Sequence, residues 1–340
     1  MAKAKKIEGL DCGADAREGL RLVLLTRLGE MCEFREAALD WGDPEGVHDM
    51  RVASRRLRSA LRDFLPHLNR RGRFEEARAE LKRLADALGE VRDEDVAIIE
   101  LEKLKDDAPP EALAGLERLA DARAERREEQ RTRLAAAITE EALESFRELF
   151  QSAVEGATRK RRRRKKKADG DAAGAHDEGA ESFRDAGRAV IKKSWGELEV
   201  LSGSLYKPLK TKRLHKMRIA AKRLRYALEL FAPCWGGATK AFAEEVAELQ
   251  GALGELHDCD TWIKECGARL AEEDDAGGKD KSSGEAEGAD SRARSRASGV
   301  WLLGHFVEAR SVHYRRALTL WHEWGQNDFA ARLSARLEED

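Results

Sequence analysis

The stretch VHDMRVASRRLR, at residues 47–58, returns as LHKMRIAAKRLR at residues 214–225, 167 positions further along the chain. The two copies share a histidine, a methionine, a run of basic residues and an apolar pattern in one register. The likeness continues as far as Pro66 in the first copy and Pro233 in the second. A recurrence of this length indicates an internal duplication, so we expect two similar basic helices in one protein.

Each copy separates its basic residues from its apolar residues when it is drawn as a helix. At about 100° per residue the basic residues span an arc of about 80°, and the apolar residues cluster roughly 130° away. The first basic stripe consists of His48, Arg51, Arg55, Arg58 and Arg62. The second consists of His215, Arg218, Lys222 and Arg225, with Glu229 at the fifth position. Arg56 falls on neither arc, so we expect it to make a different contact.

These stripes have the chemistry of an extended anion site. The helical rise of ~1.5 Å per residue places His48 about 15 Å from Arg58, a length that suits a chain of several charges. Arginine donates two hydrogen bonds to phosphate oxygens, and lysine adds a compact positive charge. A basic stripe seen once is usually a solvated face, but the repeated pattern favours binding. Surrounding phosphates would favour protonation of the histidines, so binding should strengthen as the pH falls.

The composition predicts an all-α protein and a local concentration of positive charge. Among 340 residues, 38% are charged and 6% are aromatic, which is typical of long amphipathic helices. The net charge of −2 conceals a run of nine basic residues at 159–167, and residues 207–230 carry nine Lys or Arg against one Glu. A polyanion site in the second region is therefore plausible.

Cysteine usage and hydropathy predict a soluble, cytoplasmic protein. The five cysteines are far apart and form no CxxC pair, so we expect neither a disulfide framework nor a zinc ribbon. The first residues lack the apolar core of a signal peptide, and no apolar stretch reaches the ~18 residues that span a bilayer.

Helical apolar spacing extends beyond the two motif helices, and no stretch predicts a strand. The further helices are expected at residues 14–40, 73–105, 110–136, 139–155, 181–201, 238–270, 298–324 and 328–338. Asp43 and Pro44 should cap and begin the first motif helix. Two segments interrupt the helical pattern and are expected to be disordered loops: the basic linker 156–180 and the insertion 271–297.

A second recurrence follows each motif helix: ALGEVRDED at 87–95 and ALGELHDCD at 252–260. We therefore expect one domain over 10–338, built from halves at 10–155 and 181–338, each a bundle of about four helices. The glycines should permit close helix packing. Asp93 and Asp258 either orient a basic side chain or form ordinary intrahelical contacts. Residues 257–260 cannot aim four ligands at one metal, so no metal or cofactor is expected.

The repeated motif, followed each time by Leu-Gly-Glu-x-x-Asp, resembles the CHAD domain, the conserved histidine α-helical domain. The resemblance implies two pseudo-symmetric helical bundles around a basic central groove or pore that binds inorganic polyphosphate. It implies that His48 and His215 are the name-giving histidines. The phosphate-contacting residues that it implies are Arg51, Arg55, Arg56 and Arg58, and Arg218, Lys222, Arg223 and Arg225. Basic residues from neighbouring segments are also candidates, namely Lys82, Arg83, Lys210 and Lys212.

Many relatives of this kind are fused to a CYTH-type triphosphatase domain, whose Glu-x-Glu-x-Lys signature is absent here. We therefore expect a stand-alone polyphosphate-binding protein that is not an enzyme and that targets polyphosphate granules. Both stripes should line one shared groove and hold one chain. Nucleic-acid binding is the first alternative, although aromatic platforms for bases are lacking. A metal-dependent phosphoanhydride hydrolase that uses His48 or His215 is the second. The sequence leaves the oligomeric state open.

Overall fold

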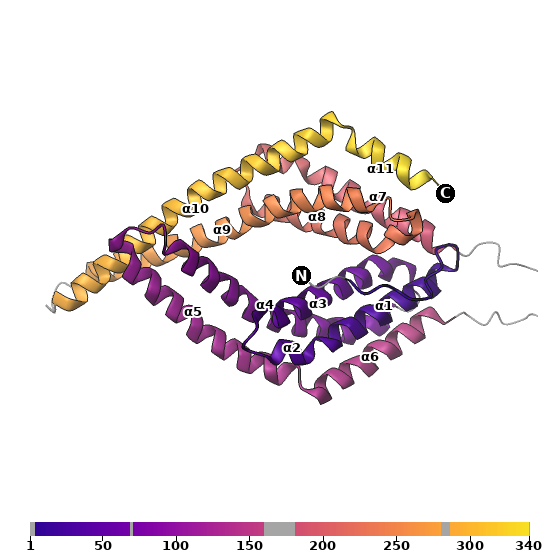
Figure 1. Cartoon of the computed structure of the whole chain (residues 1–340), viewed down its shortest axis with the longest axis horizontal. Helices are drawn as coiled ribbons and strands as arrows, with labels where there is room; N and C mark the ends of the chain where they lie inside the picture. Colours follow the sequence, from indigo (N-terminus) through magenta and orange to yellow (C-terminus); the bar gives the residue numbers. More distant parts are fainter. Residues whose placement is uncertain (1–3, 69–70, 160–180, 280–285, 340) are drawn as a thin grey trace, which may run out of the picture. The chain divides into compact units, whose positions relative to one another are not determined.

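The structure is a computed structural model that describes residues 4–68, 71–159, 181–279 and 286–339. Every regular element in these ranges is a helix, apart from one isolated bridge between Asp15 and Ser182 (Figure 1). The prediction of an all-α fold is confirmed. The α-helices are α1 Ala16–Glu33, α2 Arg35–Leu39, α3 Pro44–Phe64, α4 Glu75–Leu104, α5 Pro110–Ala137, α6 Glu140–Thr158, α7 Phe183–Leu201, α8 Thr211–Phe231, α9 Lys240–Lys279, α10 Ala286–Gln326 and α11 Phe329–Glu338. Short 3-10 turns follow α3, α7 and α8.

The duplication is visible in the helix boundaries. Helix α8 begins and ends 167 positions after α3, at residues 211 and 231 against 44 and 64. Helix α7 likewise begins at residue 183, which is 167 positions after the start of α1. The Asp43 carboxylate accepts a hydrogen bond of 2.9 Å from the Glu45 backbone N–H, and Pro44 is the first helical residue, as predicted.

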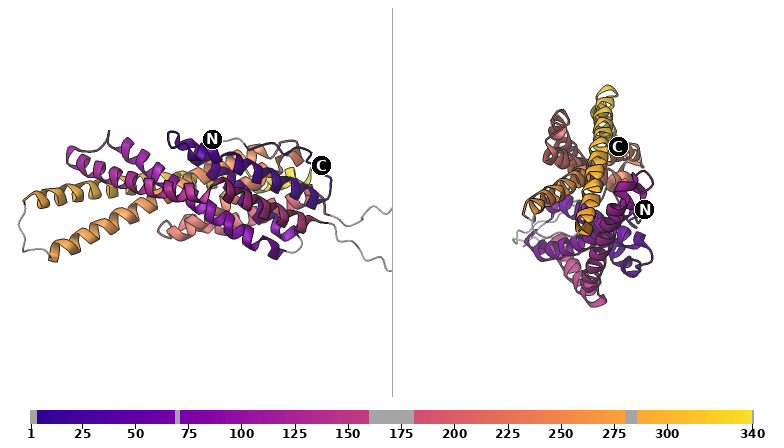
Figure 2. Two further views of the ribbon diagram at one scale, coloured as in Figure 1. Left: turned by 90° about the horizontal axis from the view of Figure 1, so that it is seen from below. Right: turned by 90° about the vertical axis from the view of Figure 1, so that its left-hand side faces the viewer.

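The second predicted loop is largely helical, so the expectation of disorder over 271–297 is wrong for its described parts. Helix α9 continues to Lys279, and α10 begins at Ala286. The two helices pack against each other, and their ends next to the connection lie apart in the left view of Figure 2. Leu270 packs against Gly299, and the Ser295 hydroxyl donates to Glu273 at 2.7 Å. Contacts between distant segments thus hold a stretch whose local composition predicts a loop. Of the basic linker, residues 156–158 end α6, and residues 160–180 lie outside the described ranges.

The chain forms two compact units that do not coincide with the two sequence halves. The first unit comprises residues 1–90, 132–192 and 226–238, and the second comprises 91–131, 193–225 and 239–340. Helices α4, α5, α7 and α8 therefore each contribute residues to both units.

The core of the first unit contains three phenylalanines from three helix ends. Phe64 and Phe231 occupy equivalent positions at the ends of α3 and α8, and their ring centroids lie 5.8 Å apart. Phe183, at the start of α7, lies 6.2 Å from the first ring and 4.9 Å from the second. Gly187 leaves room for Phe231, because a Cβ there would clash with the ring. This cluster anchors the basic helices at their carboxyl ends.

The second unit has an apolar core between α4, α5, α9 and α10. Trp262 stacks on Phe306 with ring centroids 5.0 Å apart, next to buried leucines that include Leu101, Leu116 and Leu302. Two cysteines complete this core, and burial raises the pKa of the Cys259 and Cys266 thiols to about 11. Both thiols therefore remain protonated near neutral pH. In the described part of the chain, no helix is long and apolar enough to cross a membrane.

One disulfide bond corrects the prediction made from the cysteine pattern. Cys12 and Cys234, both in the first unit, are bonded across a sequence separation of 222 residues, with Cα atoms 5.3 Å apart. The amino-terminal segment is also tied to α7, because Arg184 N–H donates to Cys12 O at 2.9 Å and Phe183 N–H donates to Ala14 O at 3.0 Å. Because a disulfide bond is present, the cysteines no longer support the prediction of a reducing, cytoplasmic compartment.

Replacing Cys12 and Cys234 with serine should lower the stability of the first unit by about 2–4 kcal/mol, because the unfolded chain loses a long closed loop. Urea unfolding with and without a reductant measures the change. The reductant should lower the midpoint of the natural protein and leave that of the double variant unchanged. If the reductant does not change the urea unfolding midpoint of the natural protein, the disulfide bond is contradicted.

Candidate functional site

Helix α3 buries its apolar side and turns its basic side away from the core. Met50, Leu57, Leu61 and Phe64 are at most 2% exposed. The stripe residues His48, Arg51, Arg55 and Arg62 are half-buried, and Arg58 is exposed. The separation of faces predicted from helical periodicity is therefore present in the first unit.

Helix α8 repeats this division in the second unit. Met217 and Leu224 are fully buried on one side. The stripe residues on the other side are half-buried, namely His215, Arg218, Lys222 and Arg225. The structure thus brings the predicted residues together within each helix, and the two stripes belong to different compact units. A single groove that both stripes share stays a prediction.

A glycine of the second motif lies under the first arginine of each stripe. A Cβ on Gly89 would be 3.7 Å from Nε of Arg51, and a Cβ on Gly254 would be 3.8 Å from Nε of Arg218. These are ordinary van der Waals distances, so the guanidinium lies close beside the glycine in each repeat. The two sequence motifs therefore form one structural unit in each repeat: the Leu-Gly-Glu helix supports the arginine of the histidine helix.

Arg56 makes the separate contact that its position on the helix predicted. Its Nη1 donates to Glu30 Oε1 on α1 at 3.2 Å, and Glu30 is almost fully buried. Arg223, the equivalent residue of α8, donates to Glu197 on α7 at 3.0 Å. These arginines connect α1 to α3 and α7 to α8, which is a positioning role.

The remaining candidate cations, one at the end of the first stripe and four outside the stripes, have acidic partners or lie at a helix start. Lys82 Nζ lies 2.8 Å from Asp86, and Arg83 Nε lies 3.0 Å from Glu80, both within exposed parts of α4. Arg62 donates to Asp63 at 2.7 Å and to Ser59 at 2.9 Å. The exposed residues Lys210 and Lys212 flank the start of α8.

His215 pairs with a histidine that the motif did not single out. Its ring centroid is 4.1 Å from that of His257 on α9, in the second unit. Burial lowers the pKa of His215, and the nearby charges of His257, Arg218 and Lys222 lower it further. Burial and Arg218 also lower the pKa of His257, against the opposing effect of Asp258 and Asp260. Both rings therefore resist protonation until an anion compensates the local positive charge.

His48 has different neighbours from His215. The ligand atoms of Glu45, His48 and Asp49 all lie within 4.8 Å of one another at the start of α3. The equivalent positions around His215 are Lys212 and Lys216. Such a trio has metal-ligand chemistry, but exposed acidic groups are common at helix starts, where the dipole favours them. We therefore assign it an electrostatic role only.

Two acidic residues of the second motif, the buried Asp95 and the half-buried Asp260, pair with arginines from other helices. Asp95 is 3.5 Å from Arg127 on α5, and Asp260 is 2.7 Å from Arg310 on α10. Burial raises the pKa of Asp95, and three arginines oppose the shift, namely Arg127, Arg131 and Arg92. Sequence reasoning had singled out Asp93 and Asp258 for such contacts. The recurrence of Asp95 and Asp260 in the second motif is a sequence signal for these contacts. No repeated motif marks their partners, Arg127 and Arg310.

Comparison with protein families matches residues 23–266 to the CHAD domain. The chain belongs to the CHAD domain family. Among solved structures, the CHAD domain from the plant Ricinus communis is similar, with a TM-score of 0.60 and 21% sequence identity over 91% of this chain and 95% of that chain. PptA from Streptomyces chartreusis is also similar, with a TM-score of 0.55 and 14% identity over 91% and 100%. At this identity the likeness shows the fold. Comparison with curated proteins gave no match.

The histidine pair should make the second unit of this CHAD domain sensitive to acid. Because the pKa of each ring lies below its ordinary value of 6.5, the unfolded state binds protons at a higher pH than the folded state does. Stability should fall as the pH drops from about 6.5 towards the folded pKa values. His257→Asn should raise the pKa of His215 without restoring it fully, because burial remains. NMR titration of the histidine rings measures this.

The exposed His322 on α10 provides the control. His322→Asn should leave the titration of His215 unchanged. If His215 in the natural protein titrates at or above 6.5, the pairing described here is contradicted.

Proposed function

We propose that this protein binds inorganic polyphosphate along its two basic stripes, without catalysis. One observation carries the proposal. Two equivalent helices, α3 and α8, each bury an apolar side and present a histidine followed by Arg or Lys at the same three positions. In both, the first arginine rests on a glycine of the next motif. A solvated surface requires only charge, whereas this arrangement also fixes where the first guanidinium lies.

Polyphosphate fits the stripes because both are linear. The four positions that both stripes share extend about 15 Å along each helix at ~1.5 Å per residue, so several successive phosphates can be contacted. Each charged contact is weak in water, but contacts to one chain add up, and binding releases counterions. Membership of the CHAD family supports a ligand of this class. Targeting to polyphosphate granules would follow from such binding.

Replacing Arg51, Arg55, Arg218 and Lys222 with alanine should abolish retention on immobilised polyphosphate while helicity by circular dichroism is unchanged. Four lost contacts of about 1 kcal/mol each would weaken binding about a thousandfold. The slope of log affinity against log salt should fall by about 0.7 for each lost phosphate contact. A folded quadruple variant that retains its affinity would refute the proposed site.

A matched control removes the same charge elsewhere. Four exposed or partly exposed arginines with acidic partners, two in each unit, can be replaced with alanine: Arg21, Arg147, Arg316 and Arg336. This control should keep most of the affinity. The two half-variants, Arg51 with Arg55 and Arg218 with Lys222, test whether both stripes hold one chain. If they do, each half-variant loses most of the affinity. If the stripes bind independently, each half-variant should instead lose half of the binding capacity and keep the affinity of the remaining stripe.

Competition separates polyphosphate from nucleic acid. Single-stranded DNA, added at equal phosphate concentration, should displace labelled polyphosphate weakly, since the stripes contain no aromatic platform for bases. Displacement as efficient as that by polyphosphate itself would favour nucleic-acid binding. The same mixtures, incubated with Mg²⁺ or Mn²⁺, should release no orthophosphate beyond the blank. Release that disappears in the His48→Ala and His215→Ala variants would establish hydrolysis.

A further inference from the structure

The ion pair between the first and third helices is repeated in the second half, but its surroundings differ. Glu30 and Arg56 are separated from Glu197 and Arg223 by the same 167 positions. The two pairs have similar lengths, 3.2 Å and 3.0 Å. The carboxylate in the first copy is 1% exposed, whereas that in the second copy is 38% exposed. Among the described residues, equivalent positions are thus covered in one repeat and open in the other.

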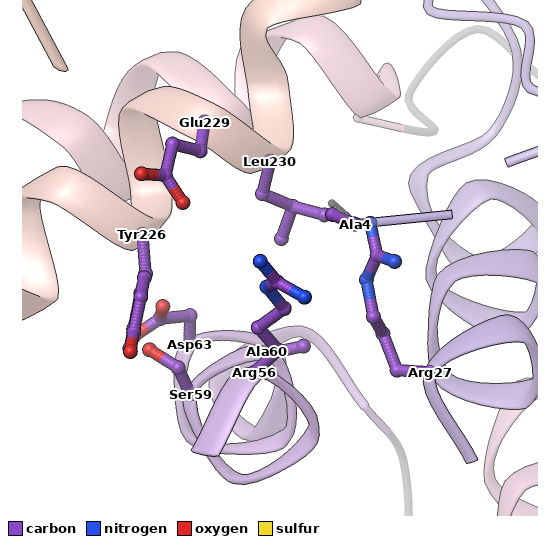
Figure 3. Close-up of a pocket in the computed structure, with 9 residues that line it drawn as sticks. All are labelled: Ala4, Arg27, Arg56, Ser59, Ala60, Asp63, Tyr226, Glu229 and Leu230. Atoms are coloured by element: carbon purple, nitrogen blue, oxygen red, sulfur yellow. The ribbon is translucent and has the colours of Figure 1, made fainter. Parts of the chain in front are cut away.

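The first copy is covered by the amino-terminal segment of the chain. The Lys5 backbone N–H donates to Glu30 Oε1 at 3.3 Å, and Arg27 Nη1 donates to the Lys5 carbonyl at 3.0 Å. The Lys5 ammonium also pairs with Glu33. Figure 3 shows Ala4 beside Arg27, and Arg56 lines the same small pocket. A non-helical segment therefore lies on α1 and α3, and its main chain bonds to the buried carboxylate and to Arg27.

The second copy presents an open groove between α7 and α8, which we call the α7–α8 groove. Its volume is about 610 Å³. Its lining includes Glu197 and Val200 from α7 and Lys216, Ile219 and Arg223 from α8. Val200 is 84% exposed, which is unusual for a valine beside other apolar side chains. At about 100° per residue, the groove residues of α8 lie roughly 130° from the stripe that begins at His215, so the groove is separate from the proposed polyphosphate site.

The α7–α8 groove differs from the equivalent covered surface on α1 and α3, and these differences indicate which chemical groups an occupant should have. Glu197 is retained and can accept a backbone N–H, as Glu30 does. Val200 is equivalent to Glu33, which binds the Lys5 ammonium in the first repeat. An occupant of the α7–α8 groove should therefore place an apolar side chain, rather than a lysine, against Val200. Lys216 stands in place of Asp49 and lines the groove with Arg223, so the groove has two cations against Glu197 and favours carboxylates. The basic amino-terminal segment of a second copy does not match this chemistry.

We propose that the α7–α8 groove binds an extended segment of a partner protein in which apolar side chains alternate with carboxylates. Its main chain donates to Glu197, its apolar side chains contact Val200 and Ile219, and its carboxylates face Lys216. The segment contacts a different side of α8 from the stripe, so polyphosphate on the stripe does not occupy the groove.

The probe is the fluorescein-labelled hexapeptide Glu-Leu-Glu-Val-Glu-Leu, added to the full-length protein saturated with polyphosphate so that the stripes are blocked. Fluorescence anisotropy should show binding at least about tenfold tighter than for hexaglutamate. The same margin is expected over Lys-Leu-Lys-Val-Lys-Leu, which is measured on protein without polyphosphate because the polyanion binds this cationic peptide directly. The double variant Val200→Asp with Ile219→Asp should lose at least about tenfold in affinity. The matched control, Val307→Asp with Val312→Asp, alters exposed valines on α10 and should bind as before.

A second variant keeps the test decisive if the aspartates disturb folding. Lys216→Glu changes an exposed residue and should reverse the preference, weakening the acidic peptide and strengthening the basic one. Equal binding of hexaglutamate, or unchanged affinity in both groove variants, would overturn the proposal. It would also be overturned if light scattering showed dimers that the groove variants dissociate, since the occupant would then be a second copy. Polyphosphate retention is measured separately, so failure here leaves that function intact.

Discussion

The burial of one apolar side on each motif helix determines where the positive charge points. On α8, Met217, Leu224, Leu228 and Phe231 are all 0% exposed. Burial of a side chain of this size contributes about 1.5–3 kcal/mol, so a rotated helix would lose several kcal/mol of apolar contact. Contacts between exposed charges are worth about 1 kcal/mol or less. The core therefore fixes the rotation of the helix, and the basic stripe follows from it.

The duplication preserved this packing more strictly than the surroundings of the charges. Both copies keep the glycine under the first arginine and the ion pair between neighbouring helices. They differ in what covers that ion pair and in the position occupied by Arg92 in one half and His257 in the other. Apolar contacts tolerate little change because interiors are close-packed, whereas exposed positions are free to diverge. The two repeats therefore share their helix packing and differ in the residues that surround their charged groups.

The all-α fold and most helix boundaries could be predicted from the sequence, because local signals determine them. Proline and Asp43 mark the start of α3, and apolar periodicity marks its buried side. The disulfide between Cys12 and Cys234 and the continuation of α9 and α10 into 271–297 could not be predicted, since both depend on contacts between distant segments. The arginine partners of Asp95 and Asp260 were missed for the same reason: each comes from a helix without a motif.

The two stripes begin with opposite local charge, which makes them unequal partners for an anion. Glu45 and Asp49 lie next to His48, whereas Lys212 and Lys216 are at the equivalent positions around His215. A unit charge at about 4 Å in water contributes about 1 kcal/mol, and salt screens it over about 8–10 Å. An anion at the start of α3 therefore meets repulsion, and one at the start of α8 meets attraction. The shared arginine positions let both helices contact phosphate, but this difference places the stronger attraction on α8, beside the titratable pair of His215 and His257.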